Sequence, residues 1–245
     1  MNLDDKIAIV TGAGSGIGRA TAIALADVGA TVIVTDVNEV GGRETVSEIG
    51  HCARFVPLDV TDRGACAALA TDLLDEHGRV DIVVNAAGWD LIQPFVDNTD
   101  DYMDRIVELN LKGPINVCKA MIPALTASGS GRIVNVASDA GRVGSTGETV
   151  YAGAKGGVVA FTKSLAREMT RHQIRVNCVC PGPTDTPLFA QQPEKMRTAL
   201  ERAIPMRRVA RPSEIADAIV FFASDRSSFV TGQVLSVSGG LTMVD

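Results

Sequence analysis

The sequence predicts an α/β fold, a single doubly wound domain over residues 1–245 with a seven-stranded parallel sheet. Short runs of β-branched and other apolar residues recur along the chain, as expected for strands that are buried on both faces of a parallel sheet. Helical stretches separate these runs, and no linker, low-complexity tract or internal repeat interrupts the alternation. This alternation favours one doubly wound domain over two smaller ones.

Each expected element can be placed by its residues. The seven predicted strands are 7–10, 31–36, 53–60, 80–88, 131–138, 174–182 and 232–240. The clearest predicted helices are 16–29, 63–78 and 149–169. In the last of these, Val150, Ala154, Val158, Phe161 and Leu165 recur at the spacing of one helix face.

Composition narrows the class of protein. The 245 residues are 46% hydrophobic and carry a formal charge of -6, which argues against nucleic acid or an anionic membrane as a partner. No apolar run reaches the ~18 residues of a membrane span, and the N-terminal residues are charged. Five cysteines without a C-x-x-C pair suggest no metal site and no disulfide framework. We expect a cytoplasmic protein with a small-molecule partner.

A glycine-rich turn follows the first predicted strand in "TGAGSGIGRA". Glycines let a chain turn tightly and bring backbone N–H groups close to a pyrophosphate at a helix N-terminus. The spacing is G-x-x-x-G-x-G rather than G-x-G-x-x-G, so a plain strand-to-helix connection is the alternative. As a dinucleotide site of the Rossmann type, the turn would bind its cofactor through Gly12, Ser15, Gly16, Ile17 and Gly18.

The ends of three further strands point to the same edge of the sheet. Asp36 lies 24 positions after Gly12, where a carboxylate accepts hydrogen bonds from the adenosine ribose and repels a 2′-phosphate. NAD is therefore expected rather than NADP, although Arg19 and Arg43 are close enough in sequence to soften that preference. The other expected cofactor contacts are Asp59, Val60, Asn85, Ala86 and Gly88, with a helix N-cap as the alternative role of Asp59.

A tyrosine and a lysine, Tyr151 and Lys155, lie one turn apart on the predicted helix 149–169. A free phenol has a pKa of about 10, so a neighbouring positive charge is needed to make it a base at neutral pH. Oxidation of a secondary alcohol requires a base and a second hydrogen-bond donor on one oxygen. Tyr151 and Ser138 are candidates for these roles, with Asn110 as a further polar residue; alone, the Tyr–Lys pair would be a surface feature.

Together these residues resemble the short-chain dehydrogenase/reductase family over essentially the whole chain. The motifs are "TGAGSGIG", "NAAG", Asn110, Ser138, "YAGAK", "PGPTDT" and "GQVLSVSGG". The resemblance implies a catalytic set of Asn110, Ser138, Tyr151 and Lys155, in which Lys155 also holds the nicotinamide ribose and Asn110 anchors a relay water. It also implies that Pro181, Gly182, Thr184 and Thr186 border the nicotinamide. Ala86 departs from the N-N-A-G of many members.

The resemblance further implies a homotetramer, in which small residues at 153, 156 and 157 permit close approach of a symmetry mate. Three functions remain open: an NAD-dependent alcohol dehydrogenase or ketone reductase, a relative of the 3-oxoacyl-[acyl-carrier-protein] reductases, and a cofactor-sensing binding protein. Retention of both Tyr151 and Lys155 disfavours the sensor, and Ser15 with Asp36 disfavours the carrier-protein reductase, whose relatives usually carry an arginine in the turn.

The substrate is expected to be a cyclic or branched hydroxyacyl-CoA, with a free alicyclic or aromatic secondary alcohol as the alternative. We predict a substrate lid at about 187–210. Positive side chains gather in and after it, where they can meet CoA phosphates: Lys195, Arg197, Arg202, Arg207, Arg208 and Arg211. A solvated helix face or a subunit contact is the other interpretation of this cluster.

Overall fold

The computed structural model describes residues 1–244; Asp245, the last residue of the predicted domain, lies outside the described residues. Its sheet has the seven parallel strands that the sequence predicts, and they lie in the order β3-β2-β1-β4-β5-β6-β7. The strands are β1 Ile7–Thr11, β2 Thr31–Asp36, β3 Ala53–Pro57, β4 Ile82–Asn85, β5 Arg132–Val136, β6 Arg175–Pro181 and β7 Val234–Val237. The order reverses between β1 and β4, which is where open α/β sheets bind ligands.

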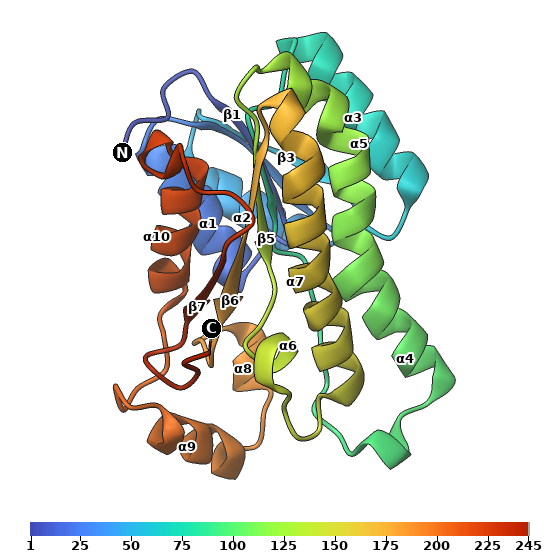
Figure 1. Ribbon diagram of the computed structural model, residues 1–245, viewed down its shortest axis with the longest axis vertical. Helices are drawn as coiled ribbons and strands as arrows, with labels where there is room; N and C mark the ends of the chain where they lie inside the picture. The colour runs from blue at the N-terminus through green and yellow to red at the C-terminus, as the bar shows by residue number, and fades with distance from the viewer. Residues whose placement is uncertain (245) are drawn as a thin grey trace.

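Helices cover both faces of this sheet (Figure 1). One face carries α1 Gly16–Asp27 and α10 Pro212–Ala223, and α2 Glu39–Ile49 lies beside α1. The other face carries α3 Arg63–His77, α5 Gly113–Ala127 and α7 Thr149–Met169. The remaining helices are α4 Asp100–Val107, α6 Ala140–Val143, α8 Pro187–Ala190 and α9 Glu194–Ala203, with short turns at η1 Phe95–Asp97, η2 Glu108–Lys112, η3 Thr170–His172 and η4 Asp225–Ser227. Within residues 1–244 no helix is long and apolar enough to cross a membrane.

The central strands are apolar on both faces because each face packs on helices. In β1, Ile9 joins the core under α3, α5 and α7, whereas Ala8 and Val10 join the core under α1 and α10. All three side chains are fully buried. This double burial explains why the strands read as continuous apolar runs rather than as alternating ones.

Five of the predicted strands, all except the first two, are longer than the observed ones, and the difference is largest for two of them. The run 80–88 becomes a strand only over Ile82–Asn85, and the run 232–240 only over Val234–Val237. The residues that follow each strand leave the sheet at its carboxyl edge and form loops there.

Helix α7 has the bounds that the sequence predicts. Two of its glycines are explained within the chain: a Cβ on Gly156 would lie 3.1 Å from the Gly141 oxygen, and one on Gly157 would lie 3.0 Å from Leu111. Gly153 has no atom within 4 Å of such a Cβ. Its role in close approach of a second subunit therefore stays a prediction.

Candidate active site

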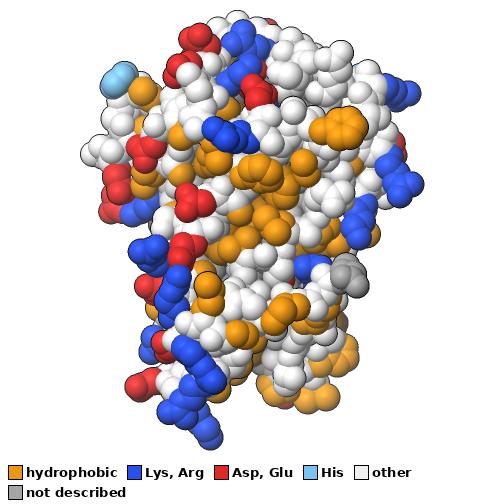
Figure 2. All heavy atoms as spheres, turned by 60° about the vertical axis from the view of Figure 1, so that its left-hand side comes forward, with side chains coloured by type: hydrophobic (Ala, Val, Ile, Leu, Met, Phe, Trp, Pro, Cys, Tyr) orange, Lys and Arg blue, Asp and Glu red, His pale blue; other side chains and the backbone are white. Residues whose placement is uncertain are grey.

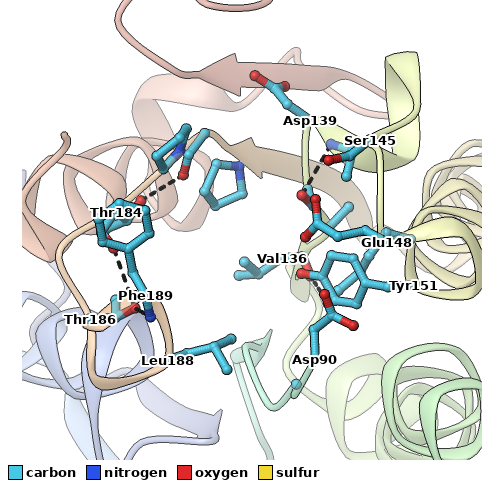
Figure 3. Close-up of a pocket in the computed structure, with 18 of the residues that line it drawn as sticks. Asp90, Val136, Asp139, Ser145, Glu148, Tyr151, Thr184, Thr186, Leu188 and Phe189 are labelled. Atoms are coloured by element: carbon cyan, nitrogen blue, oxygen red, sulfur yellow. Dashed lines mark hydrogen bonds between the residues drawn. The ribbon is translucent and has the colours of Figure 1, made fainter. Parts of the chain in front are cut away.

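A cleft of about 460 Å³ opens at the carboxyl edge of the sheet (Figure 3). Loops after β4, β5 and β6 form its floor, and α7, α8 and α9 contribute its walls. Among the residues predicted for the site, those that line it are Ile17, Ala86, Gly88, Ser138, Tyr151, Lys155, Pro181, Gly182, Thr184 and Thr186. Ile17 of the glycine turn and the Tyr–Lys helix thus meet in one cavity. The other predicted residues of the nucleotide end do not line it within residues 1–244, and their contact with the cofactor stays a prediction: Gly12, Ser15, Gly16, Gly18 and Asp36.

The glycine turn is shaped by close backbone contacts. Gly12 has a φ of 65°, and a Cβ there would lie 2.7 Å from the Ala87 Cα. A Cβ on Gly18 would lie only 2.1 Å from the Gly12 carbonyl oxygen. Side chains are therefore excluded at both positions, which leaves an open backbone cradle before α1 of the kind that phosphates bind. Ser15 is exposed at the N-cap, where its side chain makes no capping bond.

Asp36 ends β2 and joins the glycine turn. Its carboxylate accepts a hydrogen bond from the Gly14 N–H at 2.8 Å and another from the Asn38 N–H at 2.8 Å. The half-buried side chain keeps its remaining lone pairs for a ligand.

The two arginines near Asp36 have partners of their own. Arg19 donates to the Gly14 carbonyl at 2.7 Å and pairs with Glu44 at 2.9 Å. Arg43 pairs with Glu39 at 2.7 Å. Neither guanidinium is therefore free to compensate the charge of Asp36.

The loop after β3 gives its residues other roles than the sequence suggested. Asp59 is exposed and accepts from the backbone and hydroxyl of Thr61, so its alternative role as an N-cap is wrong; Asp62 caps α3 instead. Val60 is buried against Gly113. Neither Asp59 nor Val60 lines the cleft among residues 1–244, and their contact with the cofactor stays a prediction.

Asn85 points into the interior rather than into the cleft. Its Nδ2 donates to Asn135 at 2.8 Å, and Asn135 donates to Thr162 on α7 at 2.8 Å. This buried chain of hydrogen bonds joins β4, β5 and α7. Asn85 therefore fixes the strand ends relative to the catalytic helix.

Asn110 lies in the π-helical turn η2 between α4 and α5 and is fully buried. Its amide donates to the Trp89 carbonyl at 2.8 Å and to the Ile106 carbonyl at 3.1 Å. A Cβ on Gly88 would meet Asn110 Oδ1 at 2.9 Å and Lys155 Nζ at 3.4 Å. Glycine at 88 thus allows the loop after β4 to pass close to both side chains.

Lys155 is 3% exposed and lies beneath Tyr151. Its ammonium donates to the Val136 carbonyl at 2.9 Å and lies 5.6 Å from the centroid of the Tyr151 ring. Burial lowers the pKa of Lys155 to about 8. A lysine of this kind exchanges a proton near neutral pH, as acid–base chemistry requires.

The electrostatics of Tyr151 correct one expectation. We expected Lys155 to favour the phenolate, but burial raises the pKa of Tyr151 above its ordinary value, and the charges of Glu148 and Asp90 raise it further. A hydrogen bond with Ser138 acts in the opposite direction on this pKa. The protein's own groups therefore hold the phenol protonated, ready to donate to an oxygen beside Ser138.

The loop after β6 closes the cleft from the other side. Thr184 donates to the Gly182 carbonyl at 2.9 Å, and Thr186 accepts from the Phe189 N–H at 3.2 Å as the N-cap of α8. A Cβ on Gly16 would lie 3.2 Å from the Thr186 methyl. The predicted Thr186 thus stands directly against the glycine turn.

Sequence reasoning missed two acidic residues in this cleft. Asp90 follows "NAAGW", and Glu148 comes three residues before Tyr151. Both line the cleft, and Figure 3 shows both beside the Tyr151 ring. The sequence indicates the stretches 89–95 and 139–149, which follow "NAAG" and Ser138, as borders of the substrate, but no motif within them marks Asp90 or Glu148.

Comparison with known proteins agrees with this geometry. Residues 12–242 match a family model described as enoyl-(acyl carrier protein) reductase. The chain belongs to the short-chain dehydrogenase/reductase family. It is 41% identical to the 3-oxoacyl-[acyl-carrier-protein] reductase FabG of Thermotoga maritima, over 99% of this chain and 100% of the relative.

Other relatives of this short-chain dehydrogenase/reductase have different names. The cis-4-hydroxycyclohexanecarboxylate dehydrogenase of Sinomonas cyclohexanicum is 42% identical over 98% of each chain. The (2S)-[(R)-hydroxy(phenyl)methyl]succinyl-CoA dehydrogenase subunit BbsD of Thauera aromatica is 37% identical over 99% of each. A crystal structure named ribose-5-phosphate isomerase, from Brucella melitensis 16M, superimposes with a TM-score of 0.92 at 34% identity, covering 98% of this chain and 93% of that one.

These matches establish the reaction class. The protein is an oxidoreductase that acts on CH–OH groups and interconverts an alcohol and a ketone. Its family and Rossmann fold are those of enzymes that use nicotinamide cofactors.

Proposed function

We propose that this enzyme oxidises a secondary alcohol with NAD, and that the alcohol is a cyclic or branched hydroxyacyl-CoA. The observation that carries the proposal is that Ser138, Tyr151 and Lys155 line one cleft together with Ile17 of the glycine turn. In this arrangement a substrate oxygen between Ser138 and Tyr151 lies on the cofactor side of the catalytic helix.

The residues of the nucleotide end fit NAD. The Gly12–Gly18 cradle is kept free of side chains by contacts of 2.1–2.7 Å, and Asp36 offers a carboxylate that no cation neutralises among residues 1–244. A 2′-phosphate at Asp36 would meet like charge. When bound, NAD supplies the hydride acceptor. We assign its contacts to the individual residues that the sequence analysis names for the cofactor, of which Gly12 is the first and Thr186 the last.

The chain's own groups handle the proton. In oxidation Tyr151 first releases its phenol proton and then, as the phenolate, accepts the carbinol O–H proton while Ser138 donates a hydrogen bond to the same oxygen. In reduction the protonated phenol returns that proton. Lys155 has a pKa of about 8, and Asn110 lies beside it. We assign to these two residues the route by which the Tyr151 phenol releases and regains its proton.

The substrate proposal rests on the cleft walls and on resemblance. Residues 89–95, 139–149, 179–188 and 234–243 resemble 2-hydroxycyclohexanecarboxyl-CoA dehydrogenase, an enzyme of alicyclic-acid degradation. Apolar side chains from these stretches and from α9 line the cleft: Ile92, Val143, Leu188, Leu200 and Leu241. Such walls suit a carbocyclic or branched acyl group, and BbsD is named for a CoA thioester.

The structure divides the predicted basic cluster into two groups. Arg208 and Arg211 pair with Glu214 at 2.6 and 3.6 Å, which ties them to the start of α10. Within residues 1–244, no ion-pair partner is found for the other four, which are Lys195, Arg197 and Arg202 on α9 and Arg207 after it. Arg197 lies three residues before Leu200, on the side of α9 that faces the cleft.

Figure 2 shows Lys and Arg side chains at the lower end of the molecule, where Figure 1 places α9. We therefore assign the CoA phosphates to Lys195, Arg197 and Arg202, with α8 and α9 of residues 187–210 as the substrate lid.

The test compares 2-hydroxycyclohexanecarboxyl-CoA with 2-hydroxycyclohexanecarboxylic acid methyl ester, both assayed with NAD by NADH absorbance. The thioester should have the larger kcat/KM, and Lys195→Ala with Arg197→Ala should raise its KM about tenfold in a salt-sensitive way. Lys119→Ala removes an exposed charge from α5 and serves as the control. Equal kcat/KM values for thioester and ester would overturn the CoA assignment.

A 3-oxoacyl-[acyl-carrier-protein] reductase is the second candidate, because FabG relatives match the full chain. Reduction of a 3-oxoacyl thioester with NADPH, faster than oxidation of the hydroxyacyl-CoA with NAD, would favour it.

We also propose a homotetramer. Leu235 is 41% exposed in β7, the outer strand of the sheet, and Phe229 is fully exposed in the segment that precedes β7, so apolar side chains are exposed at and before an unpaired sheet edge. A molar mass of four chains in light scattering would agree with this assembly, and a monomer would contradict it.

A further inference from the structure

Two carboxyl groups, Asp90 and Glu148, stand in the substrate part of the cleft and take no part in the proton transfer described above. Asp90 lies in the loop after β4 and is 5% exposed. Glu148 is the half-buried N-cap residue of α7. Figure 3 shows them on the same side of the cavity, next to Tyr151.

The contacts of Asp90 leave one oxygen free. The Tyr102 hydroxyl donates to Asp90 Oδ1 at 2.9 Å. Oδ2 is buried and has no hydrogen-bond partner among residues 1–244, although its residue lines the cleft. A buried carboxylate oxygen without a partner is costly, so whatever occupies this end must meet it.

The two carboxyls interact electrostatically. The charge of Asp90 is one of the causes that raise the pKa of Glu148, so the two groups lie close enough for each to oppose ionisation of the other. Burial and the neighbouring Asp90 raise the pKa of Glu148 to about 7. At pH 7.5, above the pKa of Glu148, that carboxyl is mostly ionised, so the pair carries negative charge.

No arginine or lysine forms an ion pair with either carboxyl within residues 1–244. Lys155 is the cation that acts on Asp90, and its ammonium already donates to the Val136 carbonyl. Tyr102 and Tyr151 are the other titratable groups that face the pair, and both are neutral phenols, since their pKa values are raised. The substrate end of the cleft is thus negative.

We propose that the Asp90–Glu148 pair is a charge filter, which excludes substrates with a carboxylate near the carbinol and admits those whose acyl group is neutral. A like charge brought into this partly buried site is repelled, whereas a thioester, ester or amide is not. The inference deepens the proposed function, because it gives a reason for the enzyme to take the thioester rather than the free hydroxy acid. It predicts for this chain a preference opposite to the substrate in the name of one relative, the cis-4-hydroxycyclohexanecarboxylate dehydrogenase.

The experiment compares the methyl ester and the free acid of 2-hydroxycyclohexanecarboxylic acid, neither of which contains CoA. The wild-type ratio of kcat/KM, ester over acid, should be at least tenfold at pH 7.5. In the Asp90→Asn, Glu148→Gln double variant this ratio should fall at least fivefold. The control Asp97→Asn removes a charge from an exposed residue of the same β4–α4 connection and should keep the wild-type ratio.

A ratio near one in the wild type, or an unchanged ratio in a folded double variant, would overturn the proposal. If the double variant does not fold, the wild type alone decides: calorimetric binding of cyclohexanecarboxamide should be at least tenfold tighter than that of cyclohexanecarboxylate, and equal affinities would refute the filter.

The outcomes also separate the two proposals. An ester-over-acid preference without any advantage of the CoA thioester keeps the filter and removes the CoA assignment. A preference for the CoA thioester with no difference between ester and acid keeps the CoA assignment and removes the filter.

Discussion

In the nucleotide half of the cleft the chain approaches its ligand site with backbone, whereas in the substrate half it presents side chains. Gly12 and Gly18 are held at contacts that leave no room for a Cβ, and Asp36 is bound by two backbone N–H groups. On the other side, Asp90, Glu148 and Leu188 reach the cavity from three separate segments. Shape therefore dominates at one end, and charge and apolar surface dominate at the other.

The comparison teaches which changes each half tolerates. A backbone cradle fails when any side chain is added, because its neighbours are backbone atoms that cannot move aside. A side-chain pocket instead changes its preference when one group is replaced. Predictions for the two halves should differ in kind, with the reacting groups between them giving the largest effects.

Tyr151→Phe should have the largest effect. It removes the phenolic oxygen that exchanges the substrate proton but keeps the ring above Lys155, so kcat should fall by about 10³-fold. NAD affinity, measured by calorimetry, should stay within about twofold of the wild type if Tyr151 acts only on the proton. Lys155→Ala should lower both kcat and NAD affinity. More than a few per cent of activity in the phenylalanine variant would exclude Tyr151 as the acid–base group.

Gly18→Ala probes the backbone half. Its Cβ would lie 2.1 Å from the Gly12 carbonyl oxygen, so the turn must shift and the free energy of unfolding should fall by about 1–3 kcal/mol. NAD binding should weaken as well. Ser15→Ala in the same turn should change stability by less than ~0.5 kcal/mol, because that exposed side chain makes no capping bond. Urea unfolding measures both, and equal effects would contradict a cradle shaped by contacts.

The sequence alone predicted some parts of the fold and site and not others. Continuous apolar runs separated by helical stretches predicted the seven parallel strands, and helical spacing predicted α7, because burial of a strand on both faces determines its residue types. The glycines and the Tyr–Lys pair were visible because their chemistry depends on local spacing. Asp90 and Glu148 were not, since their meeting depends on where two loops end in space. The direction in which Asn85 points, and the ion pairs of Arg19 and Arg208, likewise depend on tertiary contacts.

Glu148→Gln tests the charge of the substrate half through stability. Burial raises the pKa of Glu148 to about 7 from an ordinary value of 4.5. Between those values the folded state holds more protons than the unfolded state, so wild-type stability should fall as pH rises from 4.5 to 7. The loss should be about 1–3 kcal/mol, allowing for partial exposure.

The glutamine variant should lack most of this slope and be more stable than the wild type at pH 7.5. Urea unfolding between pH 5 and 7.5 gives the comparison, below the range in which Lys155, with a pKa of about 8, loses its proton. Asp97→Asn should keep the wild-type slope. A parallel slope in the glutamine variant would show that Glu148 titrates in the folded protein as it does in the unfolded chain.

Asp36→Asn should have the smallest effect, because it changes a preference rather than a contact surface. Asp36 places one negative charge where a 2′-phosphate would lie, and a repulsion of about 1.4 kcal/mol corresponds to a tenfold ratio. The variant should therefore lower the ratio of kcat/KM for NAD over NADP by about tenfold.

Asparagine also has a single acceptor oxygen, whereas the Asp36 carboxylate accepts from both Gly14 and Asn38. One of those backbone donors loses its partner in the variant, so kcat/KM with NAD should fall somewhat even without a phosphate present. The cofactor ratio separates the two effects, because a loosened turn weakens both cofactors alike and only the lost charge favours NADP. Arg19→Ala is the matched comparison: since Arg19 is already paired with Glu44 and the Gly14 carbonyl, its loss should leave the ratio near the wild-type value. Equal use of NAD and NADP by the wild type would show that Asp36 does not face the 2′ position, and would place the ribose elsewhere along β2.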